Sequence, residues 1–517
     1  MSWREEVEQI EARRRLALAL GGAEAVARQH ARGRADVRAR IAALADAESF
    51  RELGALAGRA ELGADGALQS FEPAGIVVGT AKVAGRPVVI GGDDFTVRGG
   101  AYSAPGLRKA READGLALRR RIPLLRLLEG GGASIEGATA RRGQSGYDLT
   151  EPPPLNILAM QTLACVPVAC AALGPCVGFP AARLAASHFS VMTPGAVVLT
   201  GGPALVERAT GARIAKEELG GAGVHLRSGV VDNGATDEAD ALAQLRRFLS
   251  YLPQNAWQLP PRANCEDPPE RCDEELLGII PRNRRKPYPV REVIARVLDR
   301  DSFFEIGAHF GRGQVIGLAR AAGHPVGVLA SDCKFGGGGM SAQGARKIRR
   351  FVETCDTFNL PIVSFVDEPG FLVGAEAERA ATIRFGMEAA FAVLQSRVPW
   401  IAVVLRRSFG VAQGIHFGPG CKVLAWPSMQ SGALPVESGV HLAFAREIAA
   451  APDPEAKRRE LEDEMFAAQS VFPRAEEFGV HDLVDPRRTR PLICEWISEI
   501  QSELQHCAGP RAYSTRP

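Results

Sequence analysis

The sequence predicts an α/β fold built from two tandem copies of one domain. Three apolar segments of the first half return in the second half in the same order: AGRPVVIGGDDF and AGHPVGVLASDC, RIPLLRLLEGG and NLPIVSFVDEP, VPVACAALGPC and VPWIAVVLRRS. Pro87 and Pro123 are 36 residues apart, as are Pro325 and Pro361. A spacing kept across several apolar segments indicates an internal duplication. Strand-like runs that alternate with helical ones indicate sheets covered by helices.

Length and composition agree with two globular domains. The chain has 517 residues, of which 46% are apolar and 24% charged, and a single core rarely grows to this size. The net charge of +2 gives no reason to expect nucleic acid or an anionic membrane as a partner. The ten cysteines form no CxxC pair, so reduced thiols and a cytoplasmic location are expected. A disulfide or metal site at Cys265 and Cys272 is the less favoured alternative.

No targeting or membrane segment is expected. The N-terminus MSWREEVEQIEARRR carries acids and no apolar core, unlike a signal peptide. The stretch 152–182 has no charged residue, which is long enough for a membrane span. It also contains prolines and a Gly-Pro turn, so we interpret it as buried helix, buried strand and turn.

The first domain is expected to cover 1–255. Charged helices fill the first 45 residues with a break at Gly21-Gly22, and a strand hairpin covers 75–97. A basic helix at 103–120, a strand ending in glycines, an apolar helix, the strand VPVACAAL and a helix from Pro180 follow.

A proline-rich, charged linker is expected at 256–288. The second domain then repeats the scheme over 289–505 and ends in a disordered tail, 506–517.

Three glycine-rich turns are the candidate sites for chemistry. They cover Gly130–Ala133, Gly174–Phe179 and Phe409–Gly414, and the last two occupy equivalent positions of the repeat. If a helix begins at such a turn, its first N–H groups lack partners and carry partial positive charge. They can then hold a phosphate or an oxyanion. A tight turn without a ligand remains the alternative.

Side-chain catalysts are not evident. There is no GxSxG, HExxH or Walker A motif, and no metal site is predicted. The acids of Gly91–Asp94 are interpreted as solvated, and Gly336–Gly339 lacks the lysine of a phosphate loop. A mechanism based on backbone donors fits these observations.

Several motifs in family order carry a resemblance that covers nearly the whole chain. They are DDFTVRGG, EGGGASIEG, GPCVGF, EELGGAGVHLRSGV, ADALAQLRRFLSYLP, FVDEPGFLVG and SFGVAQG. Together they resemble the β (carboxyltransferase) subunits of biotin-dependent acyl-CoA carboxylases, the propionyl-CoA and methylcrotonyl-CoA carboxylase group. The resemblance implies two crotonase-like domains, each a β-β-α spiral, in an oligomer with a hexameric core. Acyl-CoA would bind the first domain and carboxybiotin the second, and carboxyl transfer would proceed through an enolate.

The resemblance also assigns site residues. The amides of Gly178 and Phe179 would stabilise the thioester oxygen, and those of Val411 and Ala412, on the turn opened by Gly410, the biotin oxygen. Two further sets are assigned more loosely. Acyl-CoA would contact Gly130, Gly131, Gly132 and Ala133, and its phosphates Arg32 and Arg34, for which a solvated helical face is an equal alternative.

The chain departs from the family at the two turns. Phe179 and Val411 replace glycines, and Gly414 stands where an aspartate helps to fix acyl specificity. Glu129 replaces the usual aspartate before the glycines. Backbone amides survive such substitutions, so the substitutions do not exclude the chemistry, although the added side chains reshape the pocket. The loss of the aspartate at Gly414 predicts a bulkier, branched or otherwise unusual acyl-CoA.

The resemblance further implies a partner. The chain has no AMKM-type biotinylation segment and no ATP-grasp domain, so a separate α subunit would supply biotin carboxylase and the biotin carrier. Two alternatives stay open: the carboxyltransferase of a biotin-dependent acyl-CoA decarboxylase, and a non-catalytic scaffold subunit. A hydratase-like crotonase, which would need Glu129 or Glu136 as catalytic acid, is disfavoured.

Overall fold

The computed structural model describes residues 2–133, 154–468, 471–511 and 515–516. These form two compact units by their internal contacts. Unit 1 comprises Met1–Gln258 with Pro510–Pro517, and unit 2 comprises Leu259–Gly509. The expected linker 256–288 belongs to unit 2 from Leu259 onward, and its residues Leu276 and Tyr288 lie in that unit's core.

Unit 1 is built on an eight-stranded sheet in the order β1-β4-β5-β7-β9-β10-β12, with β11 paired to β9. β1, β4 and β5 are antiparallel, and the strands from β5 onward are parallel. The strands are β1 (Arg51–Leu53), β4 (Ile76–Val83), β5 (Arg86–Asp93), β7 (Leu124–Gly130), β9 (Val168–Val177), β10 (Phe189–Met192), β11 (Val197–Leu199) and β12 (Asn233–Gly234). Two small ladders join β2 (Gly58–Leu62) to β3 (Leu68–Pro73) and β6 (Ala101–Tyr102) to β8 (Gly132–Ala133).

Unit 2 repeats this sheet in the order β13-β14-β15-β16-β17-β18-β20, with β19 paired to β17. Its strands are β13 (Phe304–Ile306), β14 (Gln314–Ala321), β15 (His324–Ser331), β16 (Ile362–Glu368), β17 (Trp400–Phe409), β18 (Lys422–Ala425), β19 (Gln430–Gly432) and β20 (Asp482–Leu483). The identical strand order confirms the predicted duplication.

The repeat extends to individual contacts. The central strand pair is interrupted at the same place in both units, so that Gly130 lies opposite Cys176 and Glu368 opposite Ser408. A serine hydroxyl caps the start of helix α4 (Ala104–Arg120), and another caps α13 (Ala342–Thr357). Ser103 accepts from the Gly106 amide and Ser341 from the Gly344 amide, a common role of short polar side chains at this position. Residues of the two halves can therefore be compared position by position.

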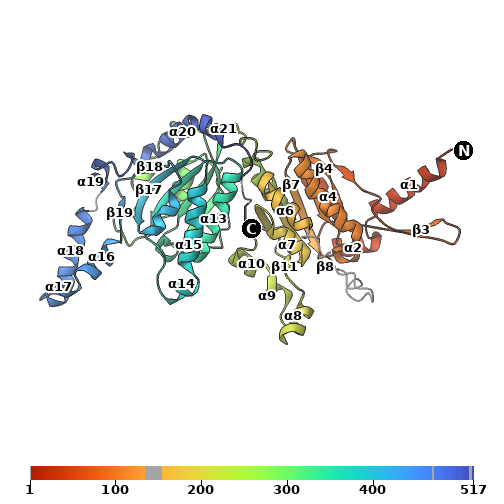
Figure 1. Cartoon of the computed structure of the whole chain (residues 1–517), viewed down its shortest axis with the longest axis horizontal. Helices are drawn as coiled ribbons and strands as arrows, with labels where there is room; N and C mark the ends of the chain where they lie inside the picture. The colour runs from red at the N-terminus through yellow and green to blue at the C-terminus, as the bar shows by residue number, and fades with distance from the viewer. Residues whose placement is uncertain (1, 134–153, 469–470, 512–514, 517) are drawn as a thin grey trace. The chain divides into compact units, whose positions relative to one another are not determined.

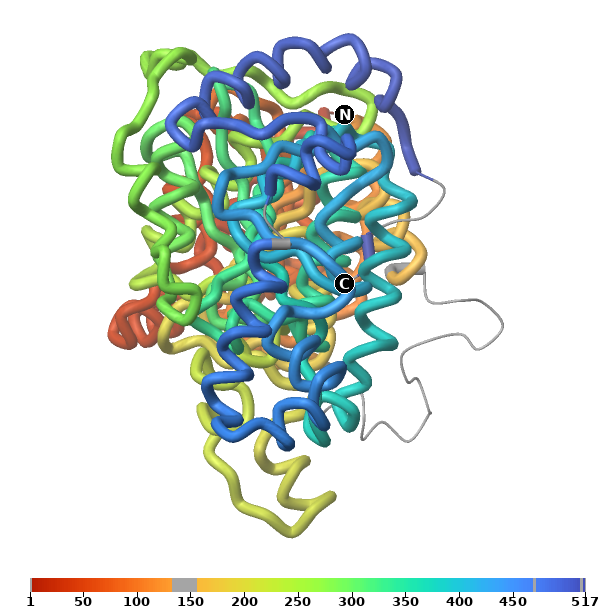
Figure 2. The backbone as a smooth tube through the Cα atoms, turned by 90° about the vertical axis from the view of Figure 1, so that its left-hand side faces the viewer, coloured from red at the N-terminus to blue at the C-terminus, as the bar shows by residue number. Residues whose placement is uncertain are grey.

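Helices cover each sheet. α4 packs beside α6 (Pro154–Cys165) in unit 1, and α13 beside α15 (Thr382–Gln395) in unit 2 (Figure 1). The other unit 1 helices are α1 (Arg4–Leu18), α2 (Ala23–His30), α3 (Val37–Leu44), η1 (Arg98–Gly100), α7 (Phe179–Ala185), α8 (Pro203–Thr210), α9 (Lys216–Gly220), α10 (Ala222–Ser228) and α11 (Glu238–Tyr251). The segment around α8, yellow-green in Figure 2, projects from the body of unit 1.

Unit 2 has several helices after β19, the last strand before β20. Its other helices are η2 (Glu274–Leu277), α12 (Val290–Val297), η3 (Gly336–Gly338), α14 (Ala375–Arg379), η4 (Val411–His416), α16 (Val436–Ala443), α17 (Ala445–Ala450), α18 (Pro454–Ala468), α19 (Val471–Glu476), η5 (Pro486–Arg488), α20 (Thr489–Glu499) and α21 (Gln501–Cys507). α21 overlaps the start of the expected tail.

The predicted helices of the first 45 residues, the hairpin near 84–85 and the basic helix are all present. The predicted turn at Gly174 is wrong, because β9 continues to Val177. Its last three residues pair with the buried strand β11, which keeps the chain extended.

The uncharged stretch after Pro153 forms α6, β9 and the start of α7, as expected. Within the described ranges, no helix has the length and apolar character needed to cross a membrane. All ten cysteines lie in those ranges, and each is a free thiol, which rules out the Cys265–Cys272 disulfide in this structure.

Candidate functional site

The turn of unit 1 is shaped by Gly178, which joins β9 to α7. Its φ of 65° and ψ of −113° lie in a region that only glycine enters at low cost. The Gly178 amide donates to the Leu199 carbonyl of β11 at 2.8 Å, so it is unavailable to a ligand. The amide of Phe179 has no acceptor within the described residues, and Pro180 has no N–H. Unit 1 therefore offers one free amide at the first two positions of its helix.

The turn of unit 2 repeats this arrangement. Gly410, with φ of 64° and ψ of −164°, joins β17 to η4, and its amide donates to the Gly432 carbonyl of β19 at 3.1 Å. The amides of Val411 and Ala412 have no acceptor in the described part of the chain. Unit 2 therefore presents two free donors, because Ala412 stands where unit 1 has Pro180.

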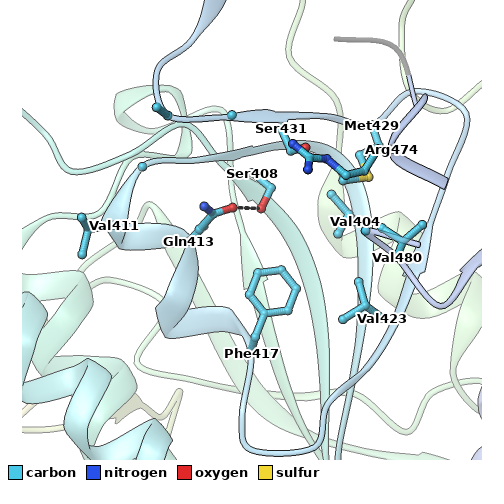
Figure 3. A pocket seen from close by; sticks show the side chains of 14 residues that line it. Val404, Ser408, Val411, Gln413, Phe417, Val423, Met429, Ser431, Arg474 and Val480 are labelled. Atoms are coloured by element: carbon cyan, nitrogen blue, oxygen red, sulfur yellow. Dashed lines mark hydrogen bonds between the residues drawn. The ribbon is translucent and has the colours of Figure 1, made fainter. Parts of the chain in front are cut away.

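A cavity of about 700 Å³ lies beside the turn of unit 2 (Figure 3). The Ser408 hydroxyl donates to the Gln413 side-chain oxygen at 2.7 Å, which braces the wall next to Val411. Apolar and polar groups share the lining, and the main ones are Val404, Ser408, Gln413, Phe417, Val423 and Arg474. The cavity can therefore hold a ligand that has both apolar and polar groups.

A buried acid lies behind the turn of unit 1. Glu129 is fully buried and accepts from Gln29 at 2.7 Å, Arg34 at 3.0 Å and Arg40 at 2.5 Å. Burial opposes the charge of Arg40, but its hydrogen bond to Glu238 and the charge of Glu129 outweigh burial and raise the pKa of the guanidinium. Arg34 is therefore paired with a carboxylate in this structure, and its contact with a CoA phosphate stays a prediction.

Unit 2 has an acid at the equivalent position. Asp367 is fully buried and binds Arg406 at 2.8 Å and Arg407 at 2.7 Å. Burial alone would raise the pKa of this carboxyl, but the charges and hydrogen bonds of Arg407 and Arg406 lower it. Each turn thus rests on a paired carboxylate, although the arginines come from different parts of the chain.

The structure places the other predicted site residues as follows. The Gly131 amide donates to the Gly99 carbonyl at 2.9 Å, and Ala133 pairs with Tyr102 through the backbone. Arg32 is exposed, and a Cβ on Gly414 would meet no atom within 4 Å. Contacts of these residues with acyl-CoA stay a prediction.

An aromatic cluster beside Phe179 was not foreseen. The Phe179 ring meets Tyr102 edge-on at 5.2 Å between centroids, and the Arg183 guanidinium lies 5.8 Å from its centre. The Tyr102 hydroxyl donates to Asp93 at 2.6 Å. Asp93 and Asp94 are both buried, so the prediction that these acids are solvated is wrong. Burial raises the pKa of both Asp93 and Tyr102. No sequence spacing links these residues, because β6 is brought to α7 only by the fold.

Comparison with known proteins shows the family of the chain. The family model described as "Carboxyl transferase domain" matches residues 28–506. The chain belongs to the carboxyl transferase family. It is a carboxyltransferase subunit of the acyl-CoA carboxylase group, as the motifs predicted.

Three relatives illustrate the range of this family. The carboxyltransferase subunit of propionyl-CoA carboxylase from Haloferax mediterranei is 32% identical, with 97% of each chain covered. The methylmalonyl-CoA decarboxylase subunit alpha of Veillonella parvula is 30% identical, with 96% of each covered. A solved transcarboxylase 12S subunit, described as a hexamer and holding methylmalonyl-CoA, superposes with a TM-score of 0.87 at 31% identity. The superposition covers 100% of this chain and 97% of the transcarboxylase chain.

Proposed function

We propose that this carboxyltransferase moves a carboxyl group between biotin, carried on a partner protein, and the α or γ carbon of an acyl-CoA. The observation that supports the proposal is the pair of equivalent turns with free amides, Phe179 in unit 1 and Val411 with Ala412 in unit 2. Both partial reactions place negative charge on a carbonyl oxygen, and amides fixed at a helix start stabilise such charge.

The residues of unit 2 fit a biotin ring. The cavity beside Val411 offers apolar walls at Val404 and Val423, and the two free amides provide donors for one polar oxygen. Carboxybiotin, when bound, supplies the carboxyl group and a ring nitrogen that accepts the α-proton of the thioester. The amides of Val411 and Ala412 would then hold the ureido oxygen, and the Phe179 amide would hold the thioester oxygen as the enolate forms.

The direct test is a transfer assay with the purified full chain. Methylmalonyl-CoA and carboxylated longer or branched acyl-CoAs would each serve as carboxyl donor. Biocytin would be the soluble acceptor, with carboxybiocytin as the measured product. We expect product that depends on the chain. No transfer from any carboxyacyl-CoA to biocytin, by folded protein, would contradict the proposal and favour a scaffold subunit.

The acyl group is proposed to be larger than propionyl. The open space around Gly414 supports this, because no side chain there limits the length or branching of a substrate. Steady-state kinetics over straight and branched acyl-CoAs would check it. Highest kcat/KM with acetyl-CoA or propionyl-CoA would refute it.

A decarboxylase subunit is the second candidate, since one relative carries that name. In that case the same turns would run the transfer from carboxyacyl-CoA to biotin. Comparison of the two directions with the native carrier separates the candidates.

The assembly proposed is a hexameric core that receives biotin from a separate α subunit in the cytoplasm. The solved relative described as a hexamer supports the stoichiometry. Light scattering of the purified chain would give its mass.

A further inference from the structure

A buried polar cluster lies directly behind the turn of unit 2. Its members are Ser364, Glu368 and His416, and all three side chains are fully buried. The His416 Nε2 atom lies 3.3 Å from a Glu368 carboxylate oxygen, and Nδ1 lies 3.3 Å from the Ser364 hydroxyl. Because an ionised carboxylate only accepts, Nε2 carries the ring proton and Nδ1 accepts from Ser364. The imidazole is therefore held at both ends.

Glu368 is itself fixed from several sides. One carboxylate oxygen accepts from the amides of Met340 and Gly370 at 3.2 and 3.0 Å. The other accepts from the Gln314 side chain at 3.2 Å. These donors come from β14 and from two loops, so the carboxylate is a stationary anchor. Partners this numerous also compensate for the burial of its charge.

His416 transmits this anchor to the amide-bearing turn. It is the last residue of η4, which begins at Val411 and contains only six residues. In so short a helix, the direction of the first amides follows the position of the last residue. At the other end of the turn, the Gly410 amide donates to the Gly432 carbonyl of β19. The amides of Val411 and Ala412 lie between these two attachments.

In unit 1 the end of the equivalent helix, α7, is held by different residues. Arg126, at the position of Ser364, donates to the carbonyls of Arg183 and Ala186 at 3.0 and 2.9 Å and so holds the end of α7. Leu184 stands at the position of His416 and is fully buried. A polar contact from the equivalent strand position thus fixes the helix end in both halves, which argues that this contact serves the turn.

We propose that Glu368 and His416 are positioning residues that set the direction of the Val411 and Ala412 amides toward the biotin oxygen. The inference rests on the proposed function, in which these amides stabilise charge on the biotin side. Both side chains are fully buried and so are not exposed to a ligand in the cavity. Their removal should therefore slow transfer while leaving acyl-CoA binding unchanged.

The principal variant is His416→Leu, which introduces the residue found at the equivalent position of unit 1. We expect kcat for carboxyl transfer to biocytin to fall about 10- to 100-fold, less than the 10²- to 10³-fold typical of losing an oxyanion donor. KM for the carboxyacyl-CoA donor should stay within about twofold, because that interaction is proposed for the other unit. His416→Gln, which keeps one donor and one acceptor, should recover most of kcat.

His188→Leu is the matched control. His188 is also buried and bonded at both ring nitrogens, to the Leu163 carbonyl and the Val168 amide, each at 3.0 Å, but it belongs to unit 1 and makes none of the contacts that hold η4. It should lower thermal stability without a comparable loss of kcat in the folded enzyme.

Amide hydrogen exchange provides a readout that needs no activity. His416→Leu and Glu368→Gln should speed exchange across 410–416, and His188→Leu should not. Unchanged exchange there, or unchanged kcat in an active His416→Leu enzyme, would overturn the inference. An inactive wild type would contradict the proposed function instead, and exchange would still decide the positioning role.

Discussion

The two turns share their backbone and differ in their donors. In both halves the glycine amide bonds to the neighbouring strand, at Leu199 or Gly432, and the next residue starts a helix. Unit 1 then has Pro180 and one free amide, whereas unit 2 has Ala412 and two. The comparison teaches that hydrogen bonds of the main chain persist through a duplication, while single substitutions change how much charge each turn can stabilise.

The largest expected effect concerns the buried acids behind the turns. Asp367→Ala removes the carboxylate that pairs Arg406 and Arg407. It should cost about 3–5 kcal/mol in the free energy of unfolding, as breaking a buried ion pair does. Glu129→Ala should cost less, because Arg40 keeps Glu238 and Arg34 can turn to solvent.

Urea unfolding followed by circular dichroism would measure both variants. Equal losses would show that the two acids are equivalent, and would break the comparison. Asp367→Asn, which preserves shape, serves as the control for side-chain volume.

Ala412→Pro sharpens the comparison directly, since it gives unit 2 the residue of unit 1. Proline fits the first turn of a helix and removes one amide donor. We expect kcat of carboxyl transfer to fall about 100-fold, as for the loss of one oxyanion donor. Ala412→Gly retains the amide and should stay within about threefold of wild type in the same assay. An active Ala412→Pro enzyme would mean that one donor suffices on both sides.

Gly178→Ala and Gly410→Ala test the shared backbone. Both glycines have φ near 65° with strongly negative ψ, and a side chain there should cost about 2 kcal/mol through strain. The two losses in unfolding free energy should be similar. A Cβ on Gly223, in α10, would meet no atom within 4 Å, so Gly223→Ala should be neutral or slightly stabilising. A loss in only one half would show that one turn can relax.

A smaller effect depends on pH and concerns one acid of unit 2, Asp356. Burial raises the pKa of Asp356 in α13 to about 6, although the Arg397 amide donates to it at 2.7 Å. The folded state then binds this proton more tightly than the unfolded state, so stability falls as pH rises from about 4 to about 6. Asp356→Asn removes this decline and should gain about 1–2 kcal/mol at pH 7.5.

Unfolding midpoints from pH 4 to 8 would show the gain. Unit 1 has Leu118 at the corresponding position of α4. Leu118→Ala should shift stability equally at every pH. A parallel pH profile for wild type and Asp356→Asn would exclude Asp356 as the cause.

The fold followed from the sequence because a duplicated pattern of apolar segments is a property of the chain itself. The proline spacing located the equivalent strands, and the glycines after β9 and β17 marked the turns. The sequence could not reveal that the Gly178 amide donates to the Leu199 carbonyl, because that hydrogen bond depends on where β11 lies. Likewise, Arg34 and Glu129 are far apart in the chain, and only the folded sheet brings them within 3.0 Å.

The departure of Phe179 from the family pattern was visible in sequence, but its consequence was not. Its ring is held by Tyr102 and Arg183, which come from separate elements. Tertiary packing decides which side chains meet in this way. Local residue preferences do not predict it.

Gly174 shows how history constrains the two halves. A Cβ there would lie 2.2 Å from the Glu129 carboxylate, so any larger residue demands a shorter acid first. The equivalent pair in unit 2 is Arg406 with Asp367, one methylene shorter. The two positions are epistatic, and the order in which they change matters. A path between the halves would therefore shorten the acid before it admits the arginine. A chimera with arginine at 174 and the full-length Glu129 should be less stable than Glu129→Asp alone.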